Sequence, residues 1–108
     1  MKLKISETEI VKSIMEYLRL KGHLCRRSNT GLTTGYSTKG KKWAIHMGES
    51  GWPDIDVICK DGKYAGIEVK SRIGKPTEDQ IRVGKDIQAR NGIWFIARSV
   101  EDVIQKGF

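Results

Sequence analysis

The sequence contains little cysteine and no long apolar run, and both absences narrow the kinds of protein it can encode. Cys25 and Cys59 are the only cysteines in 108 residues, and neither belongs to a CxxC pair. We therefore expect free thiols and no structural zinc site. No apolar stretch approaches the ~18–20 residues that a membrane-spanning helix requires, and the N-terminus lacks the apolar core of a secretory signal. We expect one cytoplasmic domain, residues 1–108, that contacts no membrane.

Acidic residues are fewer than basic ones. The chain carries 20 Lys and Arg against 13 Asp and Glu, which gives a formal net charge of +7 and a pI near 9.6. This balance favours a polyanionic partner, most simply the phosphates of nucleic acid. Many basic domains bind no nucleic acid, so the charge is informative only together with a site that could act on phosphates.

The stretch 51–70 contains the pattern that points most clearly to chemistry. Two apolar runs bounded by Gly, Pro and Asp, with a turn at 61–62, predict two antiparallel strands. Along the second strand Glu68 and Lys70 share one face, because successive side chains of a strand alternate. Antiparallel pairing can bring Asp54, at the start of the first strand, beside them.

Two carboxylates next to a lysine fit the requirements of a hard divalent cation. Magnesium takes oxygen ligands and is often held by one or two carboxylates, with water and substrate phosphate completing its shell. Asp54, Glu68 and the backbone carbonyl of Val69 are the candidate ligands, and Lys70 could orient or deprotonate a water or stabilise charge on the phosphate. The alternative is a common turn at Pro53-Asp54 and a solvated surface pair. The Pro53-Asp54 pair by itself, or Glu68 and Lys70 by themselves, would favour that alternative. The two motifs together favour the metal site.

Helical faces suggest two further site residues. Ser6 is predicted to cap the first helix, and Glu7 lies on the same stripe as its apolar residues, at the end that faces the sheet. Glu7 is therefore a candidate site residue, with Glu9 as the second choice; the alternative is that Glu7 only complements the helix dipole in the first turn. Ser6 and Glu9 are predicted to form a capping box at the first helix, and Thr77 and Gln80 one at the second. Gln80 also lies on the apolar face of its helix. The capping and site roles of Gln80 remain equally open.

Basic and polar loops flank these candidates. The segment 29–40 is rich in Gly, Thr and Lys and reads either as a mobile loop or as a hairpin. Its side chains could contact phosphates, as could the basic loop that follows Lys70. His46, in a predicted short strand at 43–47, is a weak candidate for a general base. The candidate DNA-binding residues are Arg27, Asn29, Lys39, Lys41, Lys42, Arg72 and Lys75.

The predicted elements alternate in a way that indicates an α/β fold. A helix from Ser6 to about Lys21 is followed by strands near 23–28, 43–47, 52–59 and 64–70, a helix from Thr77 to about Asn91, a strand at 93–97 and a short helix after Ser99. In that last helix, Val100, Val103 and Ile104 are predicted to face inward. The order α-β-β-β-β-α-β-α favours a mixed β-sheet flanked by helices.

Several of these motifs, taken in order, resemble a known family. The sequence resembles the VRR-NUC (virus-type replication-repair nuclease) domain of the PD-(D/E)XK nuclease superfamily, in the small stand-alone form of phages and bacteria. The residues that carry this resemblance are Glu7, Arg27-x-Asn29-x-Gly31, Gly51-Trp52-Pro53-Asp54-Ile55, Gly66-Ile67-Glu68-Val69-Lys70 and Gly74-Lys75-x-Thr77-x-x-Gln80.

The resemblance implies a restriction-endonuclease-like fold and a structure-selective DNA endonuclease. It implies Mg²⁺ as cofactor, with Mn²⁺ able to substitute, held by Glu7, Asp54, Glu68 and the carbonyl of Val69. Lys70 would be the catalytic lysine and Gln80 an auxiliary. The stand-alone form further implies a homodimer acting on branched DNA such as a Holliday junction. A nonspecific, flap or nicking nuclease of the same fold and a non-catalytic DNA-binding module are the alternatives.

Overall fold

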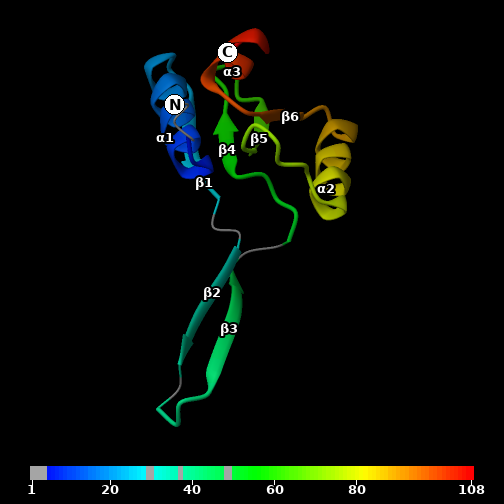
Figure 1. Ribbon diagram of the computed structural model, residues 1–108. Helices are drawn as coiled ribbons and strands as arrows, with labels where there is room; N and C mark the ends of the chain where they lie inside the picture. The colour runs from blue at the N-terminus through cyan, green and yellow to red at the C-terminus, as the bar shows by residue number, and fades with distance from the viewer. Residues whose placement is uncertain (1–4, 29–30, 37, 48–49) are drawn as a thin grey trace.

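The computed structural model describes residues 5–28, 31–36, 38–47 and 50–108 (Figure 1). Its elements follow in the order α1 (Glu7–Leu20), β1 (Leu24–Arg27), β2 (Gly31–Tyr36), β3 (Lys42–Met47), β4 (Ile55–Ile58), β5 (Tyr64–Val69), α2 (Glu78–Ala89), β6 (Ile93–Ala97) and α3 (Val100–Gln105). The predicted α/β fold, a mixed sheet flanked by helices, is confirmed. The structure has one strand more than predicted before α2.

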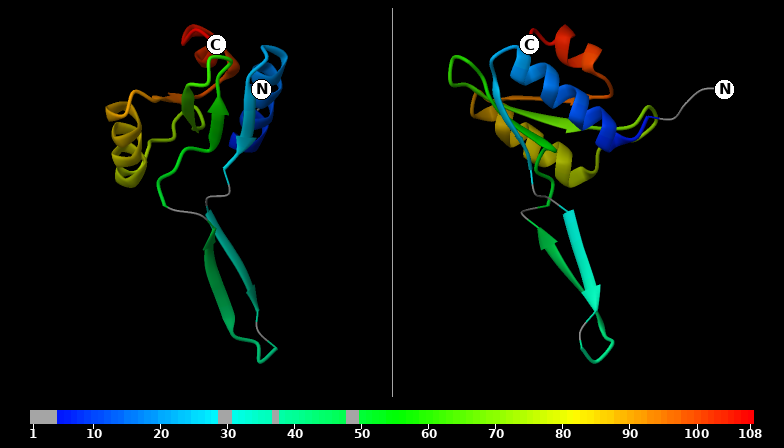
Figure 2. Two further views of the ribbon diagram at one scale, coloured as in Figure 1. Left: turned by 180° about the vertical axis from the view of Figure 1, so that it is seen from behind. Right: turned by 90° about the vertical axis from the view of Figure 1, so that its left-hand side faces the viewer.

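The main sheet has four strands in the order β1-β4-β5-β6. The first three pair antiparallel, whereas β6 runs parallel to β5. Helices α1 and α3 lie against one face of this sheet and α2 lies against the other (Figures 1 and 2). The sheet thus has a helix on each side of β5, which explains why Ala65 to Val69 are all buried.

Helix α1 forms as its sequence pattern predicts. The Ser6 side chain accepts a hydrogen bond from the Glu9 amide at 3.2 Å, which satisfies one of the free N–H groups of the first turn. The apolar stripe of α1 is buried against the sheet and comprises Ile10, Val11, Ile14 and Leu18. The helix ends at Leu20 with Lys21 as its C-cap, followed by Gly22 at a φ of 90°.

Helix α2 packs with its backbone close to β6. A Cβ atom placed on Gly84 would lie 2.3 Å from Cδ2 of Trp94, so the indole ring lies directly over the helix backbone. Glycine costs about 1 kcal/mol relative to alanine inside a helix. This close approach accounts for the mid-helix glycine at residue 84.

Strands β2 and β3 form a separate two-stranded sheet in register from Gly31↔Met47 to Tyr36↔Lys42. Of the two interpretations of segment 29–40, the hairpin is therefore the correct one. The strand predicted at 43–47 exists, but it pairs with β2 and does not join the main sheet. Glycine and threonine in β2 gave no apolar alternation, so only its pairing partner identifies it as a strand.

Two smaller expectations have different outcomes. Both cysteines are free, as predicted. In α3, Val103 is buried, but Ile104 is 43% exposed and its predicted inward orientation is wrong. Adjacent helix positions are separated by about 100°, so with Val103 directed at the core Ile104 is turned toward the edge of the buried face. Among the described residues, no helix has the length and apolarity required to cross a bilayer.

Candidate metal centre

Asp54 and Glu68 occupy neighbouring positions on adjacent strands. The register pairs Ile55 with Ile67, so Asp54 and Glu68 stand one step further toward the same end of the sheet. Oδ2 of Asp54 accepts a hydrogen bond from the Val69 amide at 2.8 Å. The Asp54 carbonyl accepts one from the Ser28 amide, also at 2.8 Å. These two bonds fix Asp54 between β5 and the end of β1.

Pro53 explains why Asp54 approaches β5 so closely. Its ring is fully buried, and a Cβ on Gly66 would lie 2.5 Å from Cγ of Pro53. Only glycine leaves room for the ring over this point of the strand. The local sequence of the Pro-Asp pair and the glycine two residues before Glu68 together set the position of the carboxylates.

Glu68 is the only buried charged side chain in the part of the chain that the structure describes, with 0% of its surface exposed. Nε2 of Gln80 donates a hydrogen bond to Oε1 of Glu68 at 2.9 Å. Oε2 of Glu68 is buried and has no hydrogen-bond partner. A buried carboxylate oxygen without a donor is costly, so this atom marks a place where a cation would be stabilising.

Gln80 both caps α2 and contacts Glu68, and its auxiliary role in the reaction stays a prediction. Its Oε1 accepts from the Thr77 amide at 2.8 Å, while the Thr77 side chain accepts from the Gln80 amide at 3.2 Å. These two bonds form the capping box of α2. Because the oxygen of the Gln80 side chain is used by the cap, its NH₂ group is the end directed at Glu68.

The electrostatics of the pair favour a proton or a cation. Burial raises the pKa of Glu68 to about 9. The neighbouring Asp54 carboxylate acts in the same direction, because its negative charge and its capacity to accept a hydrogen bond both favour a protonated Glu68. Lys70 lowers the Glu68 pKa and so acts in the opposite direction. Without a cation, the raised pKa favours a protonated Glu68 at neutral pH.

The residues present fit a magnesium ion in part. The donors are hard carboxylate oxygens, one of them buried and unpaired, and Mg²⁺ is commonly held by two carboxylates with water completing the shell. Among the residues that the structure describes, no three His, Cys, Asp or Glu side chains are grouped closely enough to hold a metal. The chain thus places two carboxylates side by side, and their role as metal ligands stays a prediction, as does a third protein ligand.

Lys70 and Val69 lie at the end of β5. The Lys70 amide donates to the Ala97 carbonyl at 3.1 Å, which continues the pairing of β5 with β6 by one residue. The side chain of Lys70 is half-buried, and its charge acts on Glu68. The amide of Val69 is used by Asp54, and the role of its carbonyl as a ligand stays a prediction.

Glu7 reaches the same end of the sheet from the opposite face. Helix α1 packs on the side of Ile67 and Val69, whereas Glu68 faces α2. Oε1 of Glu7 accepts a hydrogen bond from the Ser71 amide at 3.1 Å and raises the Glu68 pKa through its charge. Glu7 therefore lies beside the carboxylate pair without completing a three-ligand group. Its alternative, Glu9, contributes its amide to the N-cap.

A solved structure described as a VRR_NUC domain is similar to this chain. The match has a TM-score of 0.68 and covers 94% of this chain and 97% of that one, at 24% sequence identity. The chain has the VRR_NUC fold. No family model and no curated protein matches the sequence.

Arg98 is a site-proximal residue of the VRR_NUC fold that the sequence analysis missed. It follows β6, and its Nη1 donates to the carbonyls of Ser71 and Gly74 at 2.5 and 2.7 Å. The loop after Lys70 is thus held between Glu7 on one side and Arg98 on the other. The sequence did contain a signal for Arg98: it is a basic residue directly after a buried strand, at the edge of the sheet where Asp54 and Lys70 lie.

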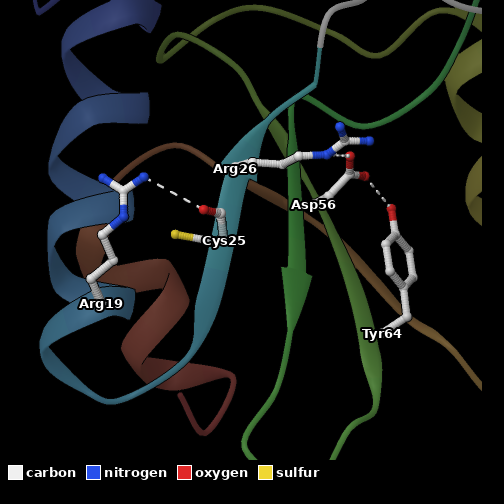
Figure 3. A network of polar contacts seen from close by, with 5 residues as sticks. All are labelled: Arg19, Cys25, Arg26, Asp56 and Tyr64. Carbon is white, nitrogen blue, oxygen red and sulfur yellow. Dashed lines mark hydrogen bonds and ion pairs between the residues drawn. The ribbon is translucent and has the colours of Figure 1, made fainter.

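Asp56 is a nearby carboxylate that does not join the pair. Nε of Arg26 lies 3.3 Å from its Oδ2, and the Tyr64 hydroxyl donates to its Oδ1 at 2.7 Å (Figure 3). Burial raises the pKa of the Tyr64 hydroxyl, and the hydrogen bond to Asp56 acts in the same direction. Asp56 is therefore committed to a structural network on the face of β1 and β4.

The predicted DNA-binding residues lie in three places of the VRR_NUC fold. Arg27 is exposed at the end of β1, and Arg72 and Lys75 are exposed in the loop after β5. Lys39 and Lys41 are exposed in the turn between β2 and β3, and Lys42 begins β3. Asn29 lies outside the described residues. His46 belongs to β3, and thus to the hairpin and not to the sheet that carries Asp54 and Glu68.

Proposed function

We propose that the protein is a metal-dependent endonuclease that hydrolyses phosphodiester bonds in DNA. The observation that carries this proposal is the pairing of the half-buried Asp54 with the fully buried Glu68, whose Oε2 has no hydrogen-bond partner among the described residues and on which the charge of Lys70 acts. The likeness to a VRR_NUC domain over 94% of the chain supports the same reading.

Each residue has a distinct task in the proposed reaction. Asp54 and Glu68 hold the cation, with Glu7 and the carbonyl of Val69 as further ligands. Lys70 stabilises negative charge on the phosphate or orients the attacking water. Gln80 keeps Glu68 oriented through its amide.

The proposed cofactor is Mg²⁺, with Mn²⁺ as a substitute. When bound, such a cation would polarise the scissile phosphate and lower the pKa of the attacking water. The chain's own contribution is to place two carboxylates from adjacent strands within one site and to keep Lys70 beside them. Cation binding at neutral pH would displace the proton that the raised pKa of Glu68 favours.

We further propose that the substrate is branched DNA and that the protein acts as a homodimer. Two copies related by a two-fold axis would present two carboxylate sites to opposed strands, as a Holliday-junction resolvase requires. A nonspecific, flap or nicking nuclease would use the same residues on other DNA. A non-catalytic binding module would have no need of Glu68 or Lys70.

The test is cleavage of a labelled four-way junction and its component duplexes in Mg²⁺, in Mn²⁺ and in EDTA. Wild type is compared with Glu68→Gln, which removes a ligand charge at nearly constant shape, and with Glu16→Gln, which removes an exposed charge on α1. We expect metal-dependent cleavage by wild type and Glu16→Gln and at least a 100-fold loss, roughly the scale of removing one group that stabilises the transition state, in Glu68→Gln. Binding without cleavage under every metal condition would overturn the catalytic proposal.

A further inference from the structure

The net positive charge of this protein is confined to one segment. Between Tyr17 and Gly48 the sequence has seven Lys and Arg and no Asp or Glu. The other 13 of the 20 basic residues are balanced by all 13 acidic ones. The whole net charge of +7 therefore belongs to the end of α1, to β1 and to the hairpin of β2 and β3.

The hairpin leaves the main sheet next to the candidate metal centre. It is inserted between β1 and β4, and the residues at these two strand ends are joined by the bond from the Ser28 amide to the Asp54 carbonyl, at 2.8 Å. In all three views the hairpin extends away from the layers of the main sheet and its helices (Figures 1 and 2). Its turn carries the exposed residues Lys39 and Lys41.

An extended two-stranded ribbon of this kind needs a partner. An isolated hairpin is marginally stable in water. Six residues per strand give a length of about 20 Å at ~3.4 Å per residue. The major groove of B-DNA, about 12 Å wide, admits a two-stranded β-ribbon. The composition fits this partner, because the hairpin has lysine, glycine and threonine and lacks acidic side chains.

We propose that the hairpin is a DNA-binding arm that lies in the major groove of the duplex being cut, with Lys39, Lys41 and Lys42 contacting its phosphates. This inference rests on the proposed function and adds the groove and the element that engages it. The arm begins beside Asp54, so a duplex in contact with it has its backbone next to the carboxylate pair. The carboxylates of the candidate site, Asp54, Glu68 and Glu7, repel the phosphates of DNA. The positive charge of the arm offsets this repulsion.

A second copy of the chain is the other occupant considered. Pairing two arms around a two-fold axis would bring like charges together, because the arm has three lysines and no acidic residue. The phosphates of DNA neutralise these lysines, whereas a second arm repels them. The charge pattern therefore favours DNA.

The first experiment measures binding to a linear duplex in EDTA, where cleavage does not contribute. The arm variant Lys39→Gln/Lys41→Gln/Lys42→Gln is compared with wild type and with Lys12→Gln/Lys63→Gln/Lys85→Gln, a matched set of exposed lysines on the body. Each lost phosphate contact lowers the slope of log K against log salt by about 0.9 in magnitude, so we expect a fall of about 2.7 in the arm variant. The control set should retain the wild-type slope. An unchanged slope in the arm variant would overturn the proposal.

The second measurement locates the arm on the duplex. Guanine N7 faces the major groove, so bound wild type should protect N7 from dimethyl sulfate and the arm variant should lose that protection. Unprotected N7 in the wild-type complex would overturn the major-groove placement. An arm variant that changes from dimer to monomer while keeping its salt slope would show that the arm pairs two copies. Neither measurement depends on catalysis. A wild-type protein that does not cleave DNA would therefore count against the proposed nuclease activity, and the binding test of the arm would still be valid.

Discussion

Gln80 shows how one side chain can join local structure to a functional site. Its oxygen closes the capping box of α2 at Thr77, and its NH₂ group holds Glu68 at 2.9 Å. Glu68 in turn keeps one oxygen buried and unpaired. At the scale of single residues, Gln80 thus binds one oxygen of Glu68, and the other oxygen of Glu68 is left where a cation could bind.

We expect the metal-free protein to lose stability as pH rises. Glu68 has its pKa raised to about 9 in the folded protein against an ordinary value near 4.5. Between these values the folded state holds a proton that the unfolded state has released. The contribution of Glu68 to the free energy of unfolding should therefore be highest below about pH 4.5. It should fall as pH rises toward 9, by at most about 1.4 kcal/mol per pH unit.

Urea unfolding in EDTA across this pH range measures the effect. Glu68→Gln cannot ionise, so its stability should lack this decline, and Mg²⁺ should restore stability to wild type most strongly at high pH. An identical pH dependence in wild type and Glu68→Gln would contradict the assignment.

Two substitutions of Gln80 separate its two roles. Gln80→Glu keeps an oxygen for the Thr77 amide but loses the NH₂ group that binds Glu68, whereas Gln80→Ala loses both. We expect Gln80→Ala to lower the free energy of unfolding by about 1–3 kcal/mol, from the lost cap and the hydrogen bond left unmade.

Cleavage assays and urea unfolding in Mg²⁺ distinguish the outcomes for Gln80. Gln80→Glu should retain more stability than Gln80→Ala in Mg²⁺ and yet cleave at least about 10-fold more slowly than wild type, because Glu68 loses its orienting partner. Wild-type cleavage by Gln80→Glu would show that Gln80 only caps the helix.

At the scale of elements, the site depends on a loop held from two sides. The segment 71–74 belongs to the loop that connects β5 to α2. Glu7, from the first turn of α1, binds the Ser71 amide, and Arg98, between β6 and α3, binds the carbonyls of Ser71 and Gly74. Two residues from distant parts of the chain thus fix the backbone directly after Lys70.

Arg98→Lys should loosen this loop without removing the charge. A lysine cannot reproduce the planar fork of arginine, so we expect faster amide exchange at Ser71 and a loss of about 1–3 kcal/mol in stability, the scale of a hydrogen bond to a charged group. Arg90→Lys is the matched control, because the Arg90 side chain donates to the Asp86 carbonyl near the exposed end of α2.

Hydrogen exchange and the split of kinetic constants test the positioning role of Arg98. Arg98→Lys should lower kcat more than it raises KM, since it displaces Glu7 and Lys70 and not the arm. Unchanged exchange at Ser71 would show that Arg98 does not hold the loop.

At the scale of the whole molecule, charge and chemistry occupy separate parts. The acidic pair lies in the sheet and helices, whose basic and acidic residues balance once the segment 17–48 is set aside, and the net charge lies in that segment. This division lets one protein attract a polyanion while keeping carboxylates for a cation.

The proposed homodimer makes a prediction at this scale. Each chain carries one Asp54–Glu68 pair, so symmetric cuts in a junction require two chains. Sedimentation should give a mass of about twice the 12.2 kDa of the chain at concentrations where junction cleavage is maximal. A monomer under those conditions, cutting strands independently, would favour the nicking alternative.

The sequence by itself determined the elements and the pair of motifs. Ser6, Thr77 and Ser99 cap the three helices as predicted, and the runs around Asp54 and Glu68 form the adjacent strands expected of them. These features are readable because caps, turns and face periodicity are local: each depends on residues only a few positions apart.

Only the tertiary structure decided the surroundings of those motifs. It buried Glu68 beneath α2, directed Glu7 to Ser71, assigned Arg98 to the loop and committed Asp56 to Arg26 and Tyr64. It also made a hairpin of a segment without alternation. Each of these outcomes depends on which distant elements pack together, and no local pattern of residues carries that information.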